Sequence, residues 1–261
     1  QYHTMTLTLF IAAIVLMALG FPVAFALAMS AALAVFVGGR YPQLVVFKEM
    51  FTGIDSFPLL AVPFFILAAE LMSGGALTAV LLRFAAQFVG HLRGGLGHAN
   101  ILSLTLFSGI SGSALADAAG PGSMMVKMMD KAGYSRAYAA ALTASTAIVG
   151  PIIPPSIIMI VYGVTANVSI AKLFIAGVFP GLILAGLFMA YTIVWALTHP
   201  DQIPPADEHL TFRQKLYESR HLIPVVTLIA AVLGSIYTGL ATATEAAALG
   251  VVGSMIIAAL Q

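Results

Sequence analysis

Two stretches of this sequence place groups that can bind an ion inside otherwise apolar surroundings. The first, residues 108–117, reads "SGISGSALAD" and supplies three serine hydroxyls, small residues and the carboxylate of Asp117. The second, residues 150–163, reads "GPIIPPSIIMIVYG" and holds three prolines within five residues. Each proline removes a backbone donor and disrupts a helix interior at a cost of about 3 kcal/mol or more, so this stretch leaves carbonyl oxygens without a helical partner.

The composition is that of an integral membrane protein. Hydrophobic residues make up 61% of the 261 residues and charged residues 8%, and the mean hydropathy is +1.03. A soluble domain carries about 25% charged residues, so this chain has too little charge to cover a globule in water. The net charge of +1 offers no basic patch for nucleic acid, and the absence of cysteine excludes disulfides and thiolate sites. No phosphate loop or nucleophile elbow occurs, so we expect no enzyme.

The apolar segments predict an all-α membrane fold with irregular helices. A spanning helix needs about 20 apolar residues, but residues 6–39 are too long for one span, and we expect Gly20-Phe21-Pro22 to divide them. The later segments are short, or long and interrupted by glycine and proline, unlike a bundle of straight helices. They are residues 57–73, 77–90, 99–129, 137–167, 173–197, 222–238 and 242 onward.

The segment 99–129 is predicted to form a re-entrant hairpin, which turns at its tip and leaves the membrane on the side it entered. With a hairpin here, nine of the eleven Lys and Arg residues lie in loops on one side, which the positive-inside rule makes cytoplasmic. If the segment were a single span, six of these nine residues would lie on the other side of the membrane, and the excess of positive charge on one side would disappear. The nine are Arg40, Lys48, Arg93, Lys127, Lys131, Arg136, Arg213, Lys215 and Arg220.

Residues 137–150 and 156–167 each read as half of a membrane helix, with "GPIIPPS" between them. Carbonyls at such breaks coordinate Na⁺, and the restarted N-termini face anionic substrate groups, so the break predicts an ion or substrate site. Two simpler interpretations stay open, namely a proline kink without a ligand and close packing of the hairpin through its small residues. Ser145 faces the same cavity or satisfies a carbonyl of its own helix.

Several strings resemble, in the same order, the large membrane subunit of tripartite ATP-independent periplasmic (TRAP) transporters, and they cover most of the chain from Ser56 onward. They are "SFPLLAVPFFILAAELM", "GHLRGGLGHAN", "SGISGSALADAAGPGS", "GYSRAYAAALTASTAIVGPIIPPSIIMIVYG", "VSIAKLFIAGVFPGLILA" and "TGLATATEAAALGVV". The sequence departs from the family at Gly120-Pro121, where the second hairpin arm should start differently, and at Ala243, where proline is usual. A second hairpin and a second broken helix are absent from this sequence.

The resemblance implies an elevator-type secondary transporter of inverted-repeat architecture, with the second repeat incomplete here. It implies Na⁺-coupled import of a small organic acid across the bacterial inner membrane by a multi-pass subunit. Two partners are implied, a smaller four-helix membrane subunit and a periplasmic substrate-binding protein. The expected organisation is scaffold helices and a cytoplasmic loop at 1–56, a helical pair at 57–98, the hairpin at 99–129, the discontinuous helix at 130–168, a scaffold helix and loop at 169–221, and the start of the second repeat at 222–261.

The resemblance also implies that Na⁺ lies between the hairpin tip and the broken helix. The implied ion-binding residues are Ser111, Gly112 and Ser113 at the tip, and Gly150, Ile153 and Pro155 at the break, the last three acting through backbone oxygens. The expected substrate-cavity residues are Asp117, Ser156 and Ser145. Two other functions stay open: an ion-coupled carboxylate carrier of similar hairpin fold that needs no binding protein, and a channel or structural membrane scaffold.

Overall fold

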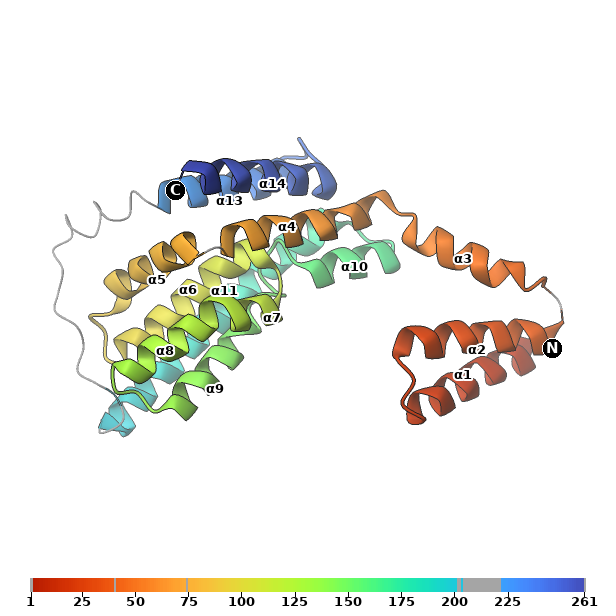
Figure 1. The fold of residues 1–261 in the computed structure, drawn as a ribbon, viewed down its shortest axis with the longest axis horizontal. Coiled ribbons are helices and arrows are strands. Elements are labelled where there is room, and N and C mark those ends of the chain that lie inside the picture. The colour runs from red at the N-terminus through yellow and green to blue at the C-terminus, as the bar shows by residue number, and fades with distance from the viewer. Residues whose placement is uncertain (1, 40, 74, 201–202, 204–221, 261) are drawn as a thin grey trace. The chain divides into compact units, whose positions relative to one another are not determined.

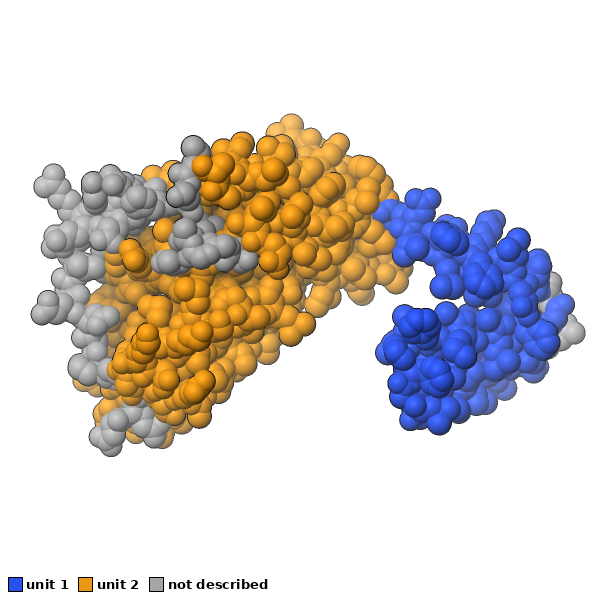
Figure 2. Space-filling model, viewed as in Figure 1, with its two compact units in different colours: residues 1–56 blue, residues 57–261 orange. Residues whose placement is uncertain are grey.

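Helices and the turns between them make up the described residues of the computed structural model, which are 2–39, 41–73, 75–200, 203 and 222–260 (Figure 1). The chain divides into two compact units, residues 1–56 and residues 57–261 (Figure 2), and each is described by itself. The predicted all-α class is confirmed. The six-part organisation and the elevator mechanism stay predictions.

The first unit consists of α1 (Tyr2–Ala18), α2 (Val23–Gly38) and α3 (Leu44–Ile54), and α1 packs against α2. The predicted division of residues 6–39 is confirmed, because α1 ends before the Gly-Phe-Pro triplet and α2 begins directly after Pro22. Proline is tolerated at this end of a helix, where its missing N–H would have no intrahelical partner.

The second unit holds the hairpin segment and the broken helix. Its elements, in chain order, are a 3₁₀ turn (Phe57–Leu60), α4 (Ala61–Ser73), α5 (Gly75–Val89), α6 (Gly95–Ser111), α7 (Ala114–Asp117), a π-helical turn (Ala118–Gly122), α8 (Ser123–Lys131), α9 (Arg136–Ala147), α10 (Ile157–Thr165), α11 (Ile170–Thr198), α13 (Ile223–Tyr237) and α14 (Ala243–Leu260).

The segment 99–129 folds as a helix–turn–helix, in which α6 leads to the turn and α7 and α8 return beside it (Figure 1). The first arm begins four residues earlier than predicted, at Gly95, because the left-handed conformation of Gly94 (φ 81°) turns the chain directly into the helix. The second arm does start irregularly, as the sequence indicated. Pro121 lies in the π-helical turn, whose wider winding relieves the clash of its ring with the preceding turn.

The predicted discontinuous helix is present as α9 and α10, separated by residues 148–156. The first half ends at Ala147, three residues earlier than predicted. The reason is that Ile148, Val149 and Gly150 each donate their amide to the carbonyl three residues before, which tightens the chain ahead of the prolines. The second half ends at Thr165, where the chain leaves the helix toward Asn167 at φ 55°.

Among the described residues, α11 is the only unbroken helix long and apolar enough to cross a membrane, with a mean hydropathy of 2.3. Five shorter apolar helices accompany it. Large apolar side chains on α11 point outward, including Phe179 at 73% exposure and Leu187 at 60%. Such apolar exposure along a whole helix suits contact with lipid rather than with water.

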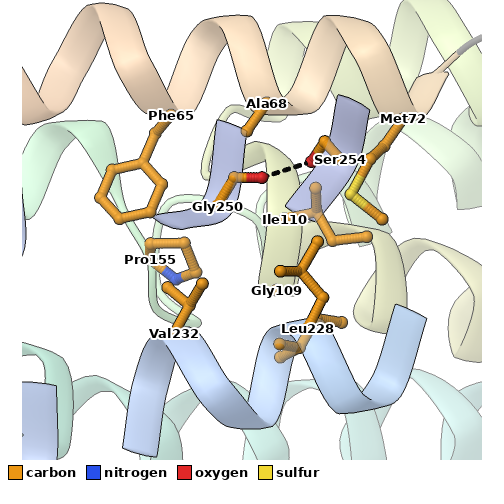
Figure 3. A pocket seen from close by; sticks show the side chains of 11 residues that line it. Phe65, Ala68, Met72, Gly109, Ile110, Pro155, Leu228, Val232, Gly250 and Ser254 are labelled. Carbon is orange, nitrogen blue, oxygen red and sulfur yellow. Dashed lines mark hydrogen bonds between the residues drawn. The ribbon is translucent and has the colours of Figure 1, made fainter. Parts of the chain in front are cut away.

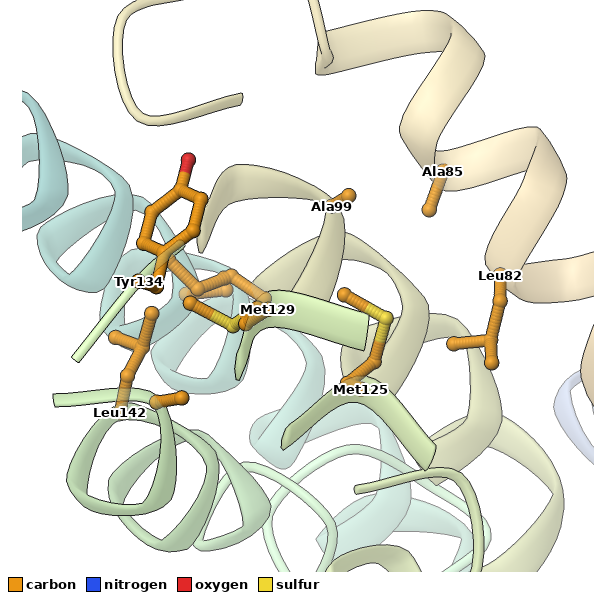
Figure 4. Packing of buried hydrophobic residues seen from close by; sticks show 10 residues of the cluster. Leu82, Ala85, Ala99, Met125, Met129, Tyr134 and Leu142 are labelled. Atoms are coloured by element: carbon orange, nitrogen blue, oxygen red, sulfur yellow. The ribbon is translucent and has the colours of Figure 1, made fainter. Parts of the chain in front are cut away.

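A cluster of buried apolar side chains holds the two hairpin arms to their neighbours (Figure 4). Met125 and Met129 of α8 are fully buried in this cluster, between Ala99 of α6, Leu82 of α5 and residues of α9. Methionine fills irregular gaps between helices, and the alanines let the helices approach closely. The hairpin therefore packs against α5 and α9, and these contacts determine what lies beside its tip.

Candidate ion-binding site

The tip of the hairpin is built by two residues with different backbone roles. Gly112 ends α6 in the left-handed conformation at φ 58°, and its amide still donates to the carbonyl of Ser108 at 3.2 Å. Ser113 then adopts an extended conformation and caps the second arm, accepting a hydrogen bond from the amide of Ala116 at 3.4 Å. Glycine is the residue that enters this backbone region without a steric cost, so the reversal between the arms depends on Gly112.

A buried carboxylate lies directly behind the tip. Asp117 is fully buried, and its Oδ1 accepts a short hydrogen bond from the hydroxyl of Ser111. The Ser111 hydroxyl also accepts from the amide of Ser113 at 3.3 Å. The second oxygen, Oδ2 of Asp117, is buried and has no hydrogen-bond partner among the described residues. A buried charge without a partner is strongly unfavourable, so this oxygen is suited to a cation.

Ser156 links the two ends of the break between α9 and α10. Its hydroxyl donates to the carbonyl of Pro151 at 2.6 Å and accepts from the amide of Met159 at 3.2 Å, which caps α10. On the other side, the Ile152 carbonyl and the Ile153 side chain lie against Gly177 and Gly181 of α11, where any side chain would clash with them. Pro154, Pro155 and Ser156 are buried and residues 151–153 are half-buried, in keeping with the rule that irregular backbone at membrane depth packs against protein or lines a cavity.

The tip and the break meet at two glycines. A Cβ added to Gly112 would overlap the carbonyl oxygen of Pro155 and lie 3.1 Å from the Cα of Ser156. A Cβ added to Gly150 would overlap Oδ2 of Asp117 and lie 3.4 Å from the amide nitrogen of Ala114. The unpartnered carboxylate oxygen and the carbonyl of Pro155 are therefore both at the contact between hairpin and broken helix.

Most of the residues named from the sequence come together at this contact. Ser111, Gly112, Gly150, Pro155 and Ser156 are buried there, with Ser113 half-buried beside them. Ile153 directs its side chain to α11, and the role of its backbone oxygen stays a prediction. Ser145 instead lines a groove with Tyr138 and Tyr191, between α9 and α11.

Asp117 contacts two of the expected ion-binding residues, and its expected place in the substrate cavity stays a prediction. Its Oδ1 accepts from the Ser111 hydroxyl, and its Oδ2 fills the space beside Gly150. Sequence reasoning also missed Asn100, which is fully buried in α6 at the start of the hairpin. A lone amide at the beginning of a long apolar run was the signal that could have identified it.

An apolar pocket lies beside the hairpin and the break and is unsuited to an ion. Gly109, Ile110 and Pro155 line it together with residues of α4, α13 and α14 (Figure 3). The one hydroxyl in its lining, that of Ser254, already donates to the carbonyl of Gly250 at 2.7 Å. Within the part of the chain that the structure describes, no group of three His, Cys, Asp or Glu residues could hold a metal ion.

The chain is similar to transport proteins along almost its whole length. Residues 10–261 match the family described as "Tripartite ATP-independent periplasmic transporter, DctM component". The sialic acid TRAP transporter permease protein SiaT of Haemophilus influenzae is 44% identical over 214 residues, which are 80% of this chain and 34% of SiaT. The large permease protein SiaM of Vibrio cholerae is 43% identical over 203 residues, 77% of this chain and 46% of SiaM.

A third relative covers more of the chain. The C4-dicarboxylate TRAP transporter large permease protein DctM of Rhodobacter capsulatus is 34% identical over 258 residues, 94% of this chain and 58% of DctM. The chain therefore spans between about a third and three fifths of the length of these relatives. All three are transporter permeases, in agreement with the prediction that the chain is no enzyme. The chain belongs to the DctM family and is the large membrane component of a TRAP transporter, or the part of one that this sequence covers.

Proposed function

We propose that the protein takes part in Na⁺-coupled import of a small organic acid across the bacterial inner membrane. The observation that carries this proposal is the contact between the hairpin tip and the broken helix, where Oδ2 of Asp117 lies buried against Gly150 with no hydrogen-bond partner among the residues that the structure describes. One carboxylate, one hydroxyl and freed carbonyls form an all-oxygen site with a single negative charge. Such a site suits a monovalent hard cation, and carbonyls at broken helices are known ligands of Na⁺.

In this proposal the residues divide into ligands and supports. Asp117, Ser111 and the backbone oxygens of Gly150, Ile153 and Pro155 hold the ion, with Gly112 and Ser113 shaping the tip. The Ser156 hydroxyl donates to the carbonyl of Pro151 and accepts from the amide of Met159, so we assign this residue to supporting the backbone of the break. The hairpin is re-entrant, and an elevator-type movement carries the occupied site across the membrane.

The substrate class comes from the relatives. Their names specify sialic acid and C4-dicarboxylates, which are both organic anions. Membership of the TRAP family supports two partners, a small membrane subunit, expected to have four helices, and a periplasmic binding protein, expected to deliver the acid. Moving one positive charge inward yields about 2.3 kcal/mol per 100 mV, enough for about fifty-fold accumulation of substrate per net charge.

Uptake into proteoliposomes tests this function. The complete permease is reconstituted with its small subunit and binding protein, and uptake of labelled sialic acid or succinate is measured under an inward gradient of Na⁺ or of choline. We expect uptake with Na⁺ only. Equal uptake in choline would refute Na⁺ coupling. Equal uptake without the binding protein would instead favour the carrier that takes free substrate, and flux that never saturates would favour a channel.

A further inference from the structure

A polar contact crosses the apolar cluster that joins the hairpin to α9. The amide nitrogen of Asn100 in α6 donates to the hydroxyl of Thr143 in α9 at 2.7 Å, and this hydroxyl donates to the carbonyl of Ala139 at 2.7 Å. Asn100 is fully buried and Thr143 is 3% exposed. Met129 of α8, drawn in Figure 4, lies beside the pair, with its sulfur 3.6 Å from the same amide nitrogen.

Stability alone does not account for Asn100. Its Oδ1 is buried and has no partner among the described residues, so half of the amide is unsatisfied. A buried polar group that lacks one of its hydrogen bonds is less favourable than an apolar side chain of the same shape. The amide instead specifies how the two helices align. It can bond to the Thr143 hydroxyl at only one position of α9 along α6, whereas purely apolar packing would also allow the helices to slide to neighbouring positions.

The pair is linked to the candidate ion site through Gly122. A Cβ added to Gly122 would lie 2.6 Å from the methyl carbon of Thr143 and 2.8 Å from the backbone oxygen of Asp117. The second hairpin arm therefore lies against Thr143 at Gly122, in the turn that directly follows Asp117 in the same arm. A shift of α9 along its axis would displace Thr143 from Asn100 and collide with this arm.

One face of α9 runs from the pair to the break. Thr143 and Thr146 lie three residues apart, a spacing that keeps their side chains on one side of α9, and Gly150 follows in the tightened turn beyond the end of the helix. Thr146 is fully buried, and its hydroxyl has no partner among the described residues. Its carbonyl accepts the amide of Val149 at 2.9 Å, in the tightened turn that presents Gly150 to Asp117.

We propose that Asn100 and Thr143 form a clamp that sets the register of α9 against the hairpin and so holds Gly150 at Asp117. Both are positioning residues, because they act on the ion through the backbone of the break. The inference rests on the proposed function, since it assigns the clamp to the same ion site. The structural part, that the clamp orders residues 148–156, can be tested without any ion.

Hydrogen exchange of the complete permease in Na⁺-free buffer tests the structural part. Thr143→Val removes the hydroxyl and keeps the shape, and Thr143→Ser keeps the hydroxyl. Thr8→Val is the control, because it removes a hydroxyl that donates to the carbonyl of Thr4 in its own helix. We expect deuterium uptake in peptides covering 148–156 to rise about two- to twelve-fold in Thr143→Val, the factor that one hydrogen bond supplies. Thr143→Ser and Thr8→Val should match the wild type. Unchanged exchange in Thr143→Val overturns the clamp.

The Na⁺ dependence of uptake tests the functional part. In Thr143→Val the Na⁺ concentration for half-maximal uptake should rise by the same factor, with uptake at saturating Na⁺ preserved, and Thr143→Ser should restore the wild-type value. Asn100→Leu should have the same effect, and the double variant should be no worse than either single one. A lower maximal rate at unchanged Na⁺ dependence contradicts the clamp. If the wild type itself shows no Na⁺ dependence while exchange at 148–156 responds, the proposed function fails and the clamp on the break stands.

Discussion

Gly150 and Asp117 are in direct contact: the space that a side chain at Gly150 would occupy is filled by Oδ2 of Asp117. Gly150 belongs to the broken helix and Asp117 to the second arm of the hairpin, so this contact joins the two irregular segments of the chain. Because the same oxygen has no hydrogen-bond partner in the described part of the chain, a cation bound there would contact both segments and hold them together.

Gly150→Ala should abolish the response to Na⁺. The added methyl group overlaps Oδ2 of Asp117, and overpacking of this kind typically costs about 1–3 kcal/mol of folding free energy. Gly186→Ala is the matched control, because a Cβ on Gly186 of α11 meets nothing within 4 Å. The measurements are thermal unfolding and Na⁺-driven uptake. Uptake by Gly150→Ala at the level of Gly186→Ala would rule out the close contact as a functional feature.

Gly112→Ala should destabilise the hairpin tip for two separable reasons. Alanine at φ 58° costs about 1–2 kcal/mol, and its Cβ would also overlap the carbonyl of Pro155. Gly39→Ala separates these effects, because Gly39 has φ 61° and a Cβ there meets nothing within 4 Å. We expect Gly112→Ala to lower the unfolding temperature more than Gly39→Ala does and to reduce uptake. Equal losses in the two variants would show that the tip does not press on the break.

Asp117→Asn should remove the stabilisation that Na⁺ provides. A ligand at one hundred times its dissociation constant stabilises the folded protein by about 2.7 kcal/mol, and the amide offers no charge to balance the ion. We expect the rise of the unfolding temperature in NaCl, relative to choline chloride, to disappear in this variant. Asp130→Asn, at an exposed carboxylate of α8, should keep it. The ion site lies elsewhere if Asp117→Asn still responds to Na⁺ as the wild type does.

Gly109→Ala should stabilise the protein and slow transport. A Cβ on Gly109 would enter the apolar pocket of Figure 3 and lie 3.8 Å from Ile229, in ordinary contact. Replacing glycine inside a helix by alanine stabilises by about 0.5–1 kcal/mol. If the hairpin moves against α13 during an elevator cycle, the added contact between the hairpin and α13 makes that movement slower. Gly234→Ala, whose Cβ meets nothing within 4 Å, is the control. A faster or unchanged uptake rate in Gly109→Ala would argue against movement at this surface.

Much of the fold could be predicted because it depends on local features of the sequence. The loss of a backbone donor at each proline, and the conformational freedom of Gly20, Gly94 and Gly112, determine where helices stop whatever surrounds them. The errors of a few residues at Gly95 and Ala147 arise from turn geometry, which hydrophobic patterns do not report.

The site was only partly predictable, because its partners are distant in the sequence. The sequence did not reveal that Asp117 faces Gly150, or that Ser145 lines a groove toward Tyr191, and the expected roles of both residues in the substrate cavity stay predictions. One helical residue differs from the next by about 100° around the axis, so a small error in register moves a side chain to another face.

The sequence by itself determined that this protein is an all-α membrane protein, and it located a polar hairpin tip and a proline break within apolar segments. These conclusions follow from composition and from the backbone chemistry of glycine, proline and serine. Only the tertiary structure decided which groups meet: Oδ2 of Asp117 against Gly150, and Asn100 against Thr143. The physical reason is that these contacts depend on how separate helices pack, and packing is set by all of their facing side chains together.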